Sequence, residues 1–317
     1  MNSVDPSWDL LADLRQMLAY PFIVNALQAG TIVAIVAGVI GWMMVLRRES
    51  FAGHTLAMVG FPGAAAAAWL GVATGDGYFV ACIAAAIAIV AFSPANRAGG
   101  LGGFTEESAV IGTVQAFALA TGLLFVSLYH GFLSGLTSLL FGTIAGVTRP
   151  QVLMLLVAAV VCLAAMAVIG RPLLWSSIDP DTAAAAGVRS GPLSVMFMVV
   201  LGTAAAGASQ ITGSLLVFAL LVAPAAAAFS ITAHPGYGIA ISVAIALTVT
   251  WLGIGCAFFW PYPIGFWVST FAYATYLIAA ATRALVDRSR RRNGRGSTII
   301  APQRVSSSTS TGGTAPC

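Results

Sequence analysis

Long runs of hydrophobic residues follow one another along almost the whole chain, separated by short stretches with polar residues, glycine or proline. A run of about 18 residues or more is long enough to cross the hydrocarbon core of a bilayer as an α-helix. A helix is required there because lipid offers no hydrogen-bond partner to an exposed peptide group. The runs predict about nine transmembrane helices, over residues 22–46, 53–73, 78–94, 107–129, 150–170, 191–209, 212–231, 237–259 and 263–283. We therefore expect an all-α, polytopic integral membrane bundle.

One segment leaves the number of crossings open between eight and ten. Residues 132–148, FLSGLTSLLFGTIAGVT, are short and rich in glycine. A transmembrane helix, a re-entrant helix and an interfacial helix would each fit this pattern.

The arginines predict the orientation of the bundle, because positive residues in short loops are kept on the cytoplasmic side. Most of them fall on one side if the N-terminus lies outside and the C-terminus inside: Arg47, Arg48, Arg97, Arg171, Arg189 and the cluster at 288–295. Three regions follow from this reading. They are an interfacial segment at 1–20, a membrane domain at 21–283 and a disordered, basic, Ser/Thr-rich cytoplasmic tail at 284–317.

Composition excludes a water-soluble globule, since 59% of the residues are hydrophobic and only 8% are charged. The chain contains no lysine, so it cannot carry the lysine of a Walker A motif and is not itself a P-loop ATPase. The basic tail is expected to contact anionic lipid, and a nucleic-acid partner is not expected. The four cysteines are scattered and are interpreted as packing residues.

The loop between the fifth and sixth predicted spans has the pattern of a short capped helix. In IDPDTAAAAGV, residues 178–188, Asp179 can cap the helix, Pro180 suits its first position, Asp181 favours its positive end and Gly187 can close it. The small side chains, Ala185 among them, would give this helix a flat face that can seat in a groove of another protein. An ordinary connector is the alternative reading of the same residues.

Several stretches resemble the permease subunits of the ABC importers for zinc and manganese. The resemblance rests on IDPDTAAAAGV together with AYPFIVNALQAGTIVAIVAGVIGWMMVLRR, LLFGTIAGV, GSLLVFALLVAPAAAAFSIT and WPYPIGFWVSTFAYATYLI, in that order, and covers roughly residues 15–285. It implies a multi-pass protein of a bacterial plasma membrane that works as a homodimer. It also implies a separate ATPase subunit that meets residues 178–188, and an extracytoplasmic substrate-binding protein.

The second predicted span departs from this family. The family carries an aspartate and a histidine one helical turn apart, followed by Pro-Gly, and these two residues are implicated in handling the metal. Here the two positions are His54 and Met58, while Pro62 is kept. Residues at i and i+4 still face one direction on a helix, but imidazole and thioether are softer ligands than the family pair.

His54 therefore has three readings. It is a pathway ligand for a cation, since ionisable groups inside membranes are functional by default, or an interfacial residue without a function, or part of a site for a cargo that is not a bare metal ion. Met58 alone reads as packing. The candidate pathway residues are His54, Thr55, Met58, Pro62, Gln115 and Gln210, with His54 as the one candidate metal ligand.

The sequence thus predicts a permease subunit that imports a divalent metal ion by alternating access. The chain would bind no cofactor of its own, and ATP would be used by the partner subunit. One alternative is a permease of the same fold for a chelated metal or a haem-like compound. Another is an ATP-independent secondary transporter. An intramembrane protease would need a serine in a G-x-S-G context, which the chain lacks.

Overall fold

The computed structural model describes residues 15–92, 104–128, 147–213, 217–260 and 262–294, and all its regular elements in these ranges are helices. They are α2 (Pro21–Leu46), α3 (Ser50–Leu70), α4 (Thr74–Phe92), α5 (Phe104–Leu128), α7 (Arg149–Ile178), α8 (Pro180–Ala185), α9 (Ser190–Thr212), α10 (Val217–Ile231), α11 (Pro235–Phe259) and α12 (Ile264–Gly294). Each predicted span coincides with one of these helices, and the all-α prediction is confirmed.

Seven of the helices are long and apolar enough to cross a membrane: α2, α4, α5, α7, α9, α11 and α12. The helices of the other two predicted spans do not meet these criteria of length and apolar composition, for different reasons. α10 is apolar, and its described part has 15 residues. α3 has 21 residues but a less apolar composition, which includes His54 and Pro62. The predicted number of nine crossings stays a prediction. The ambiguous segment lies, apart from its last two residues, outside the described residues.

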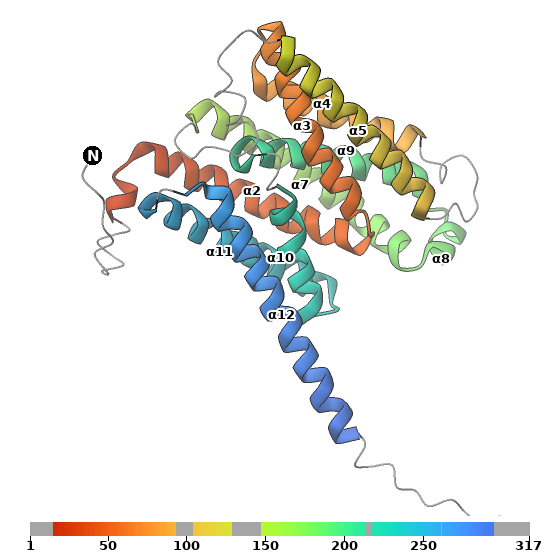
Figure 1. The fold of residues 1–317 in the computed structure, drawn as a ribbon. Helices are drawn as coiled ribbons and strands as arrows, with labels where there is room; N and C mark the ends of the chain where they lie inside the picture. Colours follow the sequence, from red (N-terminus) through yellow and green to blue (C-terminus); the bar gives the residue numbers. More distant parts are fainter. Residues whose placement is uncertain (1–14, 93–103, 129–146, 214–216, 261, 295–317) are drawn as a thin grey trace, which may run out of the picture. The chain divides into compact units, whose positions relative to one another are not determined.

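The packing is organised around two helices. α2 packs against α7, α10 and α11, whereas α9 packs against α3, α4 and α7 and also meets α2 (Figure 1). α3 lies between α4 and α5, so the helix that carries most of the candidate pathway residues is enclosed by protein. Contacts divide the chain into residues 1–280 and residues 281–317, and α12 begins in the first unit and ends in the second.

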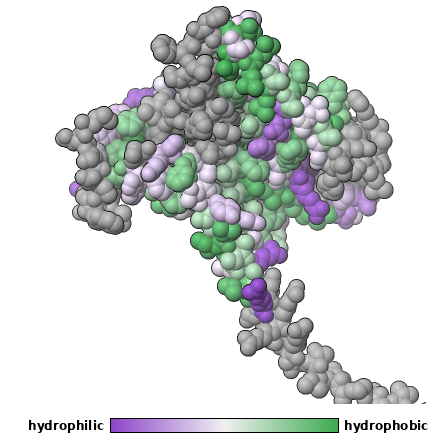
Figure 2. Space-filling model, in the orientation of Figure 1, coloured by the Kyte–Doolittle hydropathy of each residue, from purple (hydrophilic) through white to green (hydrophobic). Residues whose placement is uncertain are grey.

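Exposed hydrophobic side chains cover much of the described surface (Figure 2). Phe117, Val168 and Val80, for example, are 73%, 76% and 68% exposed. A soluble protein does not expose contiguous apolar surface of this extent. The surface therefore fits a protein that sits in a bilayer, as the composition predicts.

Small residues allow the helices to approach closely. A Cβ atom at Gly63 of α3 would lie 2.3 Å from the carbonyl oxygen of Gly77 of α4, and a Cβ at Gly77 would lie 2.3 Å from the carbonyl oxygen of Gly63. A Cβ at Gly41 of α2 would lie 2.0 Å from the carbonyl oxygen of Leu221 of α10. These backbones pack directly on one another, as is common between helices in membranes.

Candidate functional site

A tight turn sets the direction in which α3 enters the bundle. α2 ends at Leu46, and the amides of Arg48 and Glu49 donate to the carbonyls of Val45 and Met44, which is the hydrogen-bond pattern of a Schellman motif. Arg48 occupies the left-handed position of this motif with φ 61°, where glycine is the usual residue. The turn thus accepts local strain and starts α3 at Ser50, one turn before His54.

His54 is half-buried on the first turns of α3. Its ring packs edge-on against Phe218 of α10, with ring centroids 4.9 Å apart. The Nδ1 atom is buried and has no hydrogen-bond partner among the described residues. A buried nitrogen of this kind is costly to leave without a partner, and within the described part of the chain the Nδ1 of His54 stays available to a ligand or a proton. Met58 is also half-buried, one turn further along α3.

Thr55 and Gln115 are brought together by the packing of α3 on α5. The Thr55 hydroxyl is fully buried and donates to Oε1 of Gln115 over 3.1 Å. Pro62, further along α3, is buried against α5, where a Cβ at Gly122 would lie 3.0 Å from the Cβ of Pro62. Two of the predicted pathway residues are therefore partners, and Pro62 lies on the same α3–α5 interface.

Gln210 lies elsewhere. It is near the end of α9, where its Oε1 would lie 3.3 Å from a Cβ at Gly75, at the beginning of α4. Because α4 follows α3 after a three-residue connection, Gly75 lies beside the end of α3 and His54 beside its beginning. The structure therefore does not join Gln210 to His54 in one cluster. The Nε2 of Gln210 is buried without a partner among the described residues.

The described residues contain no group of three or more His, Cys, Asp or Glu side chains that could hold a metal ion. Within the described residues, His54 is therefore not part of a group of three or more such ligands. A metal-binding role for His54 stays a prediction.

A cavity of about 820 Å³ lies between α3, α4 and α5. Its wall includes Pro62 and is otherwise formed mainly by alanine, valine and phenylalanine side chains. The hydroxyls of Thr113 and Thr121, which also line it, donate to carbonyls of their own helix. This cavity therefore offers apolar surface and suits hydrocarbon better than a hydrated ion.

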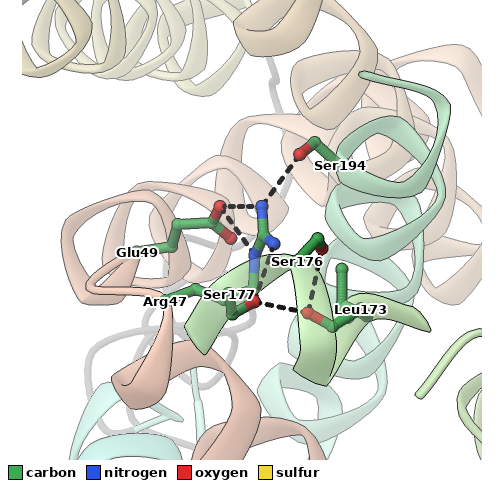
Figure 3. Close-up of polar contacts among 6 residues, drawn as sticks. All are labelled: Arg47, Glu49, Leu173, Ser176, Ser177 and Ser194. Atoms are coloured by element: carbon green, nitrogen blue, oxygen red, sulfur yellow. Dashed lines mark hydrogen bonds and ion pairs between the residues drawn. The ribbon is translucent and has the colours of Figure 1, made fainter. Parts of the chain in front are cut away.

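A network of polar contacts centres on the side chain of Arg47, at the turn between α2 and α3 (Figure 3). Its Nε and Nη2 donate to Oε1 of Glu49 over 3.0 and 2.8 Å. Its Nη1 donates to the Ser177 hydroxyl of α7 over 3.2 Å, and its Nη2 donates to the Ser194 hydroxyl of α9 over 2.8 Å. The guanidinium also lies 5.4 Å from the centre of the Phe197 ring. We call these five residues the Arg47 cluster.

The position of Arg47 in the sequence predicts only the orientation of the bundle and not this cluster. The available signal was the RRE triplet, which places opposite charges two residues apart at a break between two apolar helices. Its partners Ser177 and Ser194 are distant in sequence and carry no recognisable pattern. The ion pair is largely buried, since both side chains are 13% exposed.

The short helix α8 lies between the two helices that contact Arg47. It forms as predicted, because the Asp179 side chain accepts from the Thr182 amide over 3.1 Å and also from the Thr182 hydroxyl, and Pro180 is its first residue. Gly187 follows with φ +85°. The hydrogen bonds from Thr182 hold the pKa of the Asp179 carboxyl below its usual value. The helix itself covers residues 180–185 of the predicted 178–188.

α8 is exposed apart from Ala183, which is 1% exposed. Asp179, Pro180, Asp181 and Ala185 all lie on the surface of the described structure. A capped helix with small exposed side chains is thus presented at the end of the bundle where the Arg47 cluster lies.

Comparisons with known proteins agree with this architecture. Residues 19–283 match the model of a family described as the ABC 3 transport family. The chain is 29% identical, over 68% of its length and 72% of the relative, to the manganese transport system membrane protein MntC of Halalkalibacterium halodurans. It is 28% identical to the chelated iron transport system membrane protein YfeC of Yersinia pestis, over 79% of this chain and 82% of the relative.

A solved structure is also similar. PsaBC from Streptococcus pneumoniae in complex with Fab aligns with a TM-score of 0.74 and 25% sequence identity, over 85% of this chain and 95% of that chain. The family model matches far more than half of the chain, and the helices and exposed apolar surface fit a multi-pass membrane protein. This chain belongs to the ABC 3 transport family.

Proposed function

We propose that the chain is the membrane-spanning permease subunit of an ABC importer for a divalent metal ion, in a bacterial plasma membrane. The observation that carries this proposal is the family match over residues 19–283, of which α8 is part. The relatives named as manganese and chelated iron transport membrane proteins support a metal cargo. The absence of lysine excludes a Walker A motif, so ATP would be hydrolysed by a separate subunit.

In this proposal the ATPase subunit docks on α8, through Asp179, Pro180, Asp181, Ala185 and the turn at Gly187. The exposed side chains of α8 are short, and a short helix of this kind can enter a groove without steric obstruction. The N-terminus would lie outside, the permease would act as a homodimer, and a substrate-binding protein would deliver the cargo from outside. ATP-driven closure of the ATPase dimer would switch the permease between outward-open and inward-open states.

Docking on α8 is tested by co-purification of the ATPase subunit with the permease. We expect Asp179→Arg and Gly187→Trp each to abolish co-purification, because the first removes the helix cap and the second places an indole at a φ of +85° beside the docking face. Arg171→Gln, an exposed change on α7, is the matched control and should leave binding intact. An ATPase-free permease that transports by itself would instead support a secondary transporter.

The cargo is tested by uptake of radioactive Mn²⁺, Zn²⁺ and Fe²⁺ into proteoliposomes that contain the permease and its ATPase. If His54 is a pathway ligand, His54→Ala lowers uptake of one of these ions and lowers the metal content of the purified protein. Met58→Leu keeps the side-chain volume but removes the sulfur. It should lower uptake if the thioether is a ligand and leave uptake unchanged if Met58 only packs. Equal uptake and equal metal content in native and His54→Ala protein would refute a ligand role.

A chelated metal is the second candidate cargo. It is favoured by the lack of a metal-holding group of side chains in the described residues and by the similarity to a chelated iron transport protein. The double substitution of His54→Asp with Met58→His restores the family's pair on α3. Gain of Mn²⁺ or Zn²⁺ uptake that the native chain lacks would show that the native cargo differs, whereas unchanged uptake would count against this candidate.

A further inference from the structure

The Arg47 cluster joins three parts of the chain that are far apart in sequence. Arg47 and Glu49 form the turn at the start of α3, Ser177 lies near the end of α7, and Ser194 lies near the start of α9. Figure 3 shows the guanidinium between the two serines, with the carboxylate of Glu49 on its other side. α8 connects α7 to α9, so both helices that flank it are bonded to one side chain.

The geometry at Arg47 is that of a rigid joint. A guanidinium is planar and presents its donors in a fixed fork, and here Nε, Nη1 and Nη2 all make hydrogen bonds. The side chain is 13% exposed, so solvent screens these bonds little. Phe197, fully buried on α9, limits sideways movement of the group. A displacement of the ends of α7 and α9 must therefore move the turn or break several bonds.

The turn passes such a displacement directly to α3. Only Arg48 and Glu49 separate Arg47 from Ser50, and the Schellman hydrogen bonds fix both of them. His54 lies one turn into the same helix, and Thr55 bonds to α5. α3 also packs closely on α4 where Gly63 meets Gly77. Movement that enters at Arg47 thus reaches the candidate pathway residues through rigid backbone.

We propose that Arg47 is a positioning residue that couples α8 to α3, so that force applied at the ATPase docking helix reorients the helix that carries His54. This inference rests on the proposed permease function. It adds the mechanical link between the docking helix and the pathway, and it makes Ser177 and Ser194 parts of that link.

The sharpest variant is Ser177→Ala with Ser194→Ala. It removes the two bonds that tie Arg47 to α7 and α9, and it keeps both charges and the ion pair. Arg47→Gln with Glu49→Gln is the second variant, and it removes both charges together so that no single charge is left buried. Arg171→Gln serves as the control, because it removes an exposed guanidinium from α7 outside the cluster. Size-exclusion profiles and SDS-unfolding midpoints verify that each variant is folded.

The first readout is the number of Mn²⁺ ions taken up per ATP hydrolysed by the reconstituted complex. We expect uptake per ATP to fall about tenfold in both cluster variants, within the usual range of coupling between sites, while ATPase co-purification and ATP hydrolysis stay near the native level. The control should match the native complex. A parallel fall in uptake and hydrolysis, or no change in their ratio, would overturn the proposal.

The second readout needs neither cargo nor ATPase. Nitroxide labels at Phe51 on α3 and Ala184 on α8, both exposed, report the distance between the two helices by pulsed electron paramagnetic resonance in a cysteine-free background. We expect a narrow distance distribution in the otherwise native chain and a broader one with Ser177→Ala and Ser194→Ala. Identical distributions in the two proteins would show that the Arg47 cluster does not fix the position of α8 relative to α3. If the native complex takes up none of Mn²⁺, Zn²⁺ and Fe²⁺, the proposed cargo fails while this measurement still decides the role of Arg47.

Discussion

Replacement of Gly63 by alanine tests the closest contact of α3. The new Cβ would lie 2.3 Å from the Gly77 carbonyl oxygen, whereas ordinary van der Waals contact begins at 3.4 Å, so the two helices must separate by about 1 Å. A gap of about that size removes a quarter to a half of the attractive dispersion energy of each contact across the interface. Overpacking of this kind lowers the free energy of unfolding by about 1–3 kcal/mol. Alanine returns about 1 kcal/mol through its higher helix propensity. We expect a net loss of about 0–2 kcal/mol in the free energy of unfolding.

The assay is SDS-induced unfolding of the purified protein in mixed micelles, followed by circular dichroism. Gly112→Ala on α5 is the matched control, because a Cβ there has no heavy atom within 4 Å, and it should stabilise by about 0.5–1 kcal/mol through propensity alone. Gly63→Ala with Gly77→Ala should destabilise by less than the sum of the single changes, since one separation of the helices accommodates both methyl groups. A Gly63→Ala protein as stable as the control would refute the close approach of α3 and α4.

Further predictions concern the Asp179 cap, the Thr55–Gln115 bond and the turn at Arg48. Asp179→Ala should speed hydrogen exchange of the Thr182 amide, because it removes the oxygen that accepts from this amide. Asp179→Asn keeps an acceptor oxygen and should leave the amide largely protected. Because the Thr182 bonds lower the pKa of Asp179, the stability that its carboxylate adds to α8 is present above the ordinary carboxyl pKa and is lost as the pH falls through the lowered value. A double-mutant cycle of Thr55→Val and Gln115→Leu should give a coupling of about 0.6–1.7 kcal/mol by SDS unfolding, and a value of zero would dismiss the bond. Arg48→Gly should stabilise by about 1 kcal/mol by relieving the left-handed strain, which Arg48→Ala should not do.

The sequence predicts the structural features that depend on a single segment of the chain. Apolar run length predicted the helices because a run of given length in lipid has one structural solution, and local capping chemistry predicted α8 from Asp179, Pro180 and Gly187. Thr55 and Gln115, both named as pathway candidates, proved to be partners across two helices.

What depends on packing between distant helices could not be read from the sequence in the same way. Gln210 was grouped with His54 as a polar residue of the pathway, yet it lies beside the beginning of α4. The Arg47 cluster needs α7 and α9 to bring Ser177 and Ser194 to one guanidinium, and no spacing along the chain encodes that meeting. The edge-on contact of His54 with Phe218 likewise depends on the position of α10.

The modest hydropathy of α3 has a consequence for how the protein is made. A helix with His54, three glycines and Pro62 gains little by entering lipid alone during synthesis, although it is well enclosed in the finished bundle. α4 follows after only three residues and is apolar enough to cross a membrane. We expect the two helices to leave the translocon together as a hairpin, so that truncation of a nascent chain just before α4 leaves α3 uninserted.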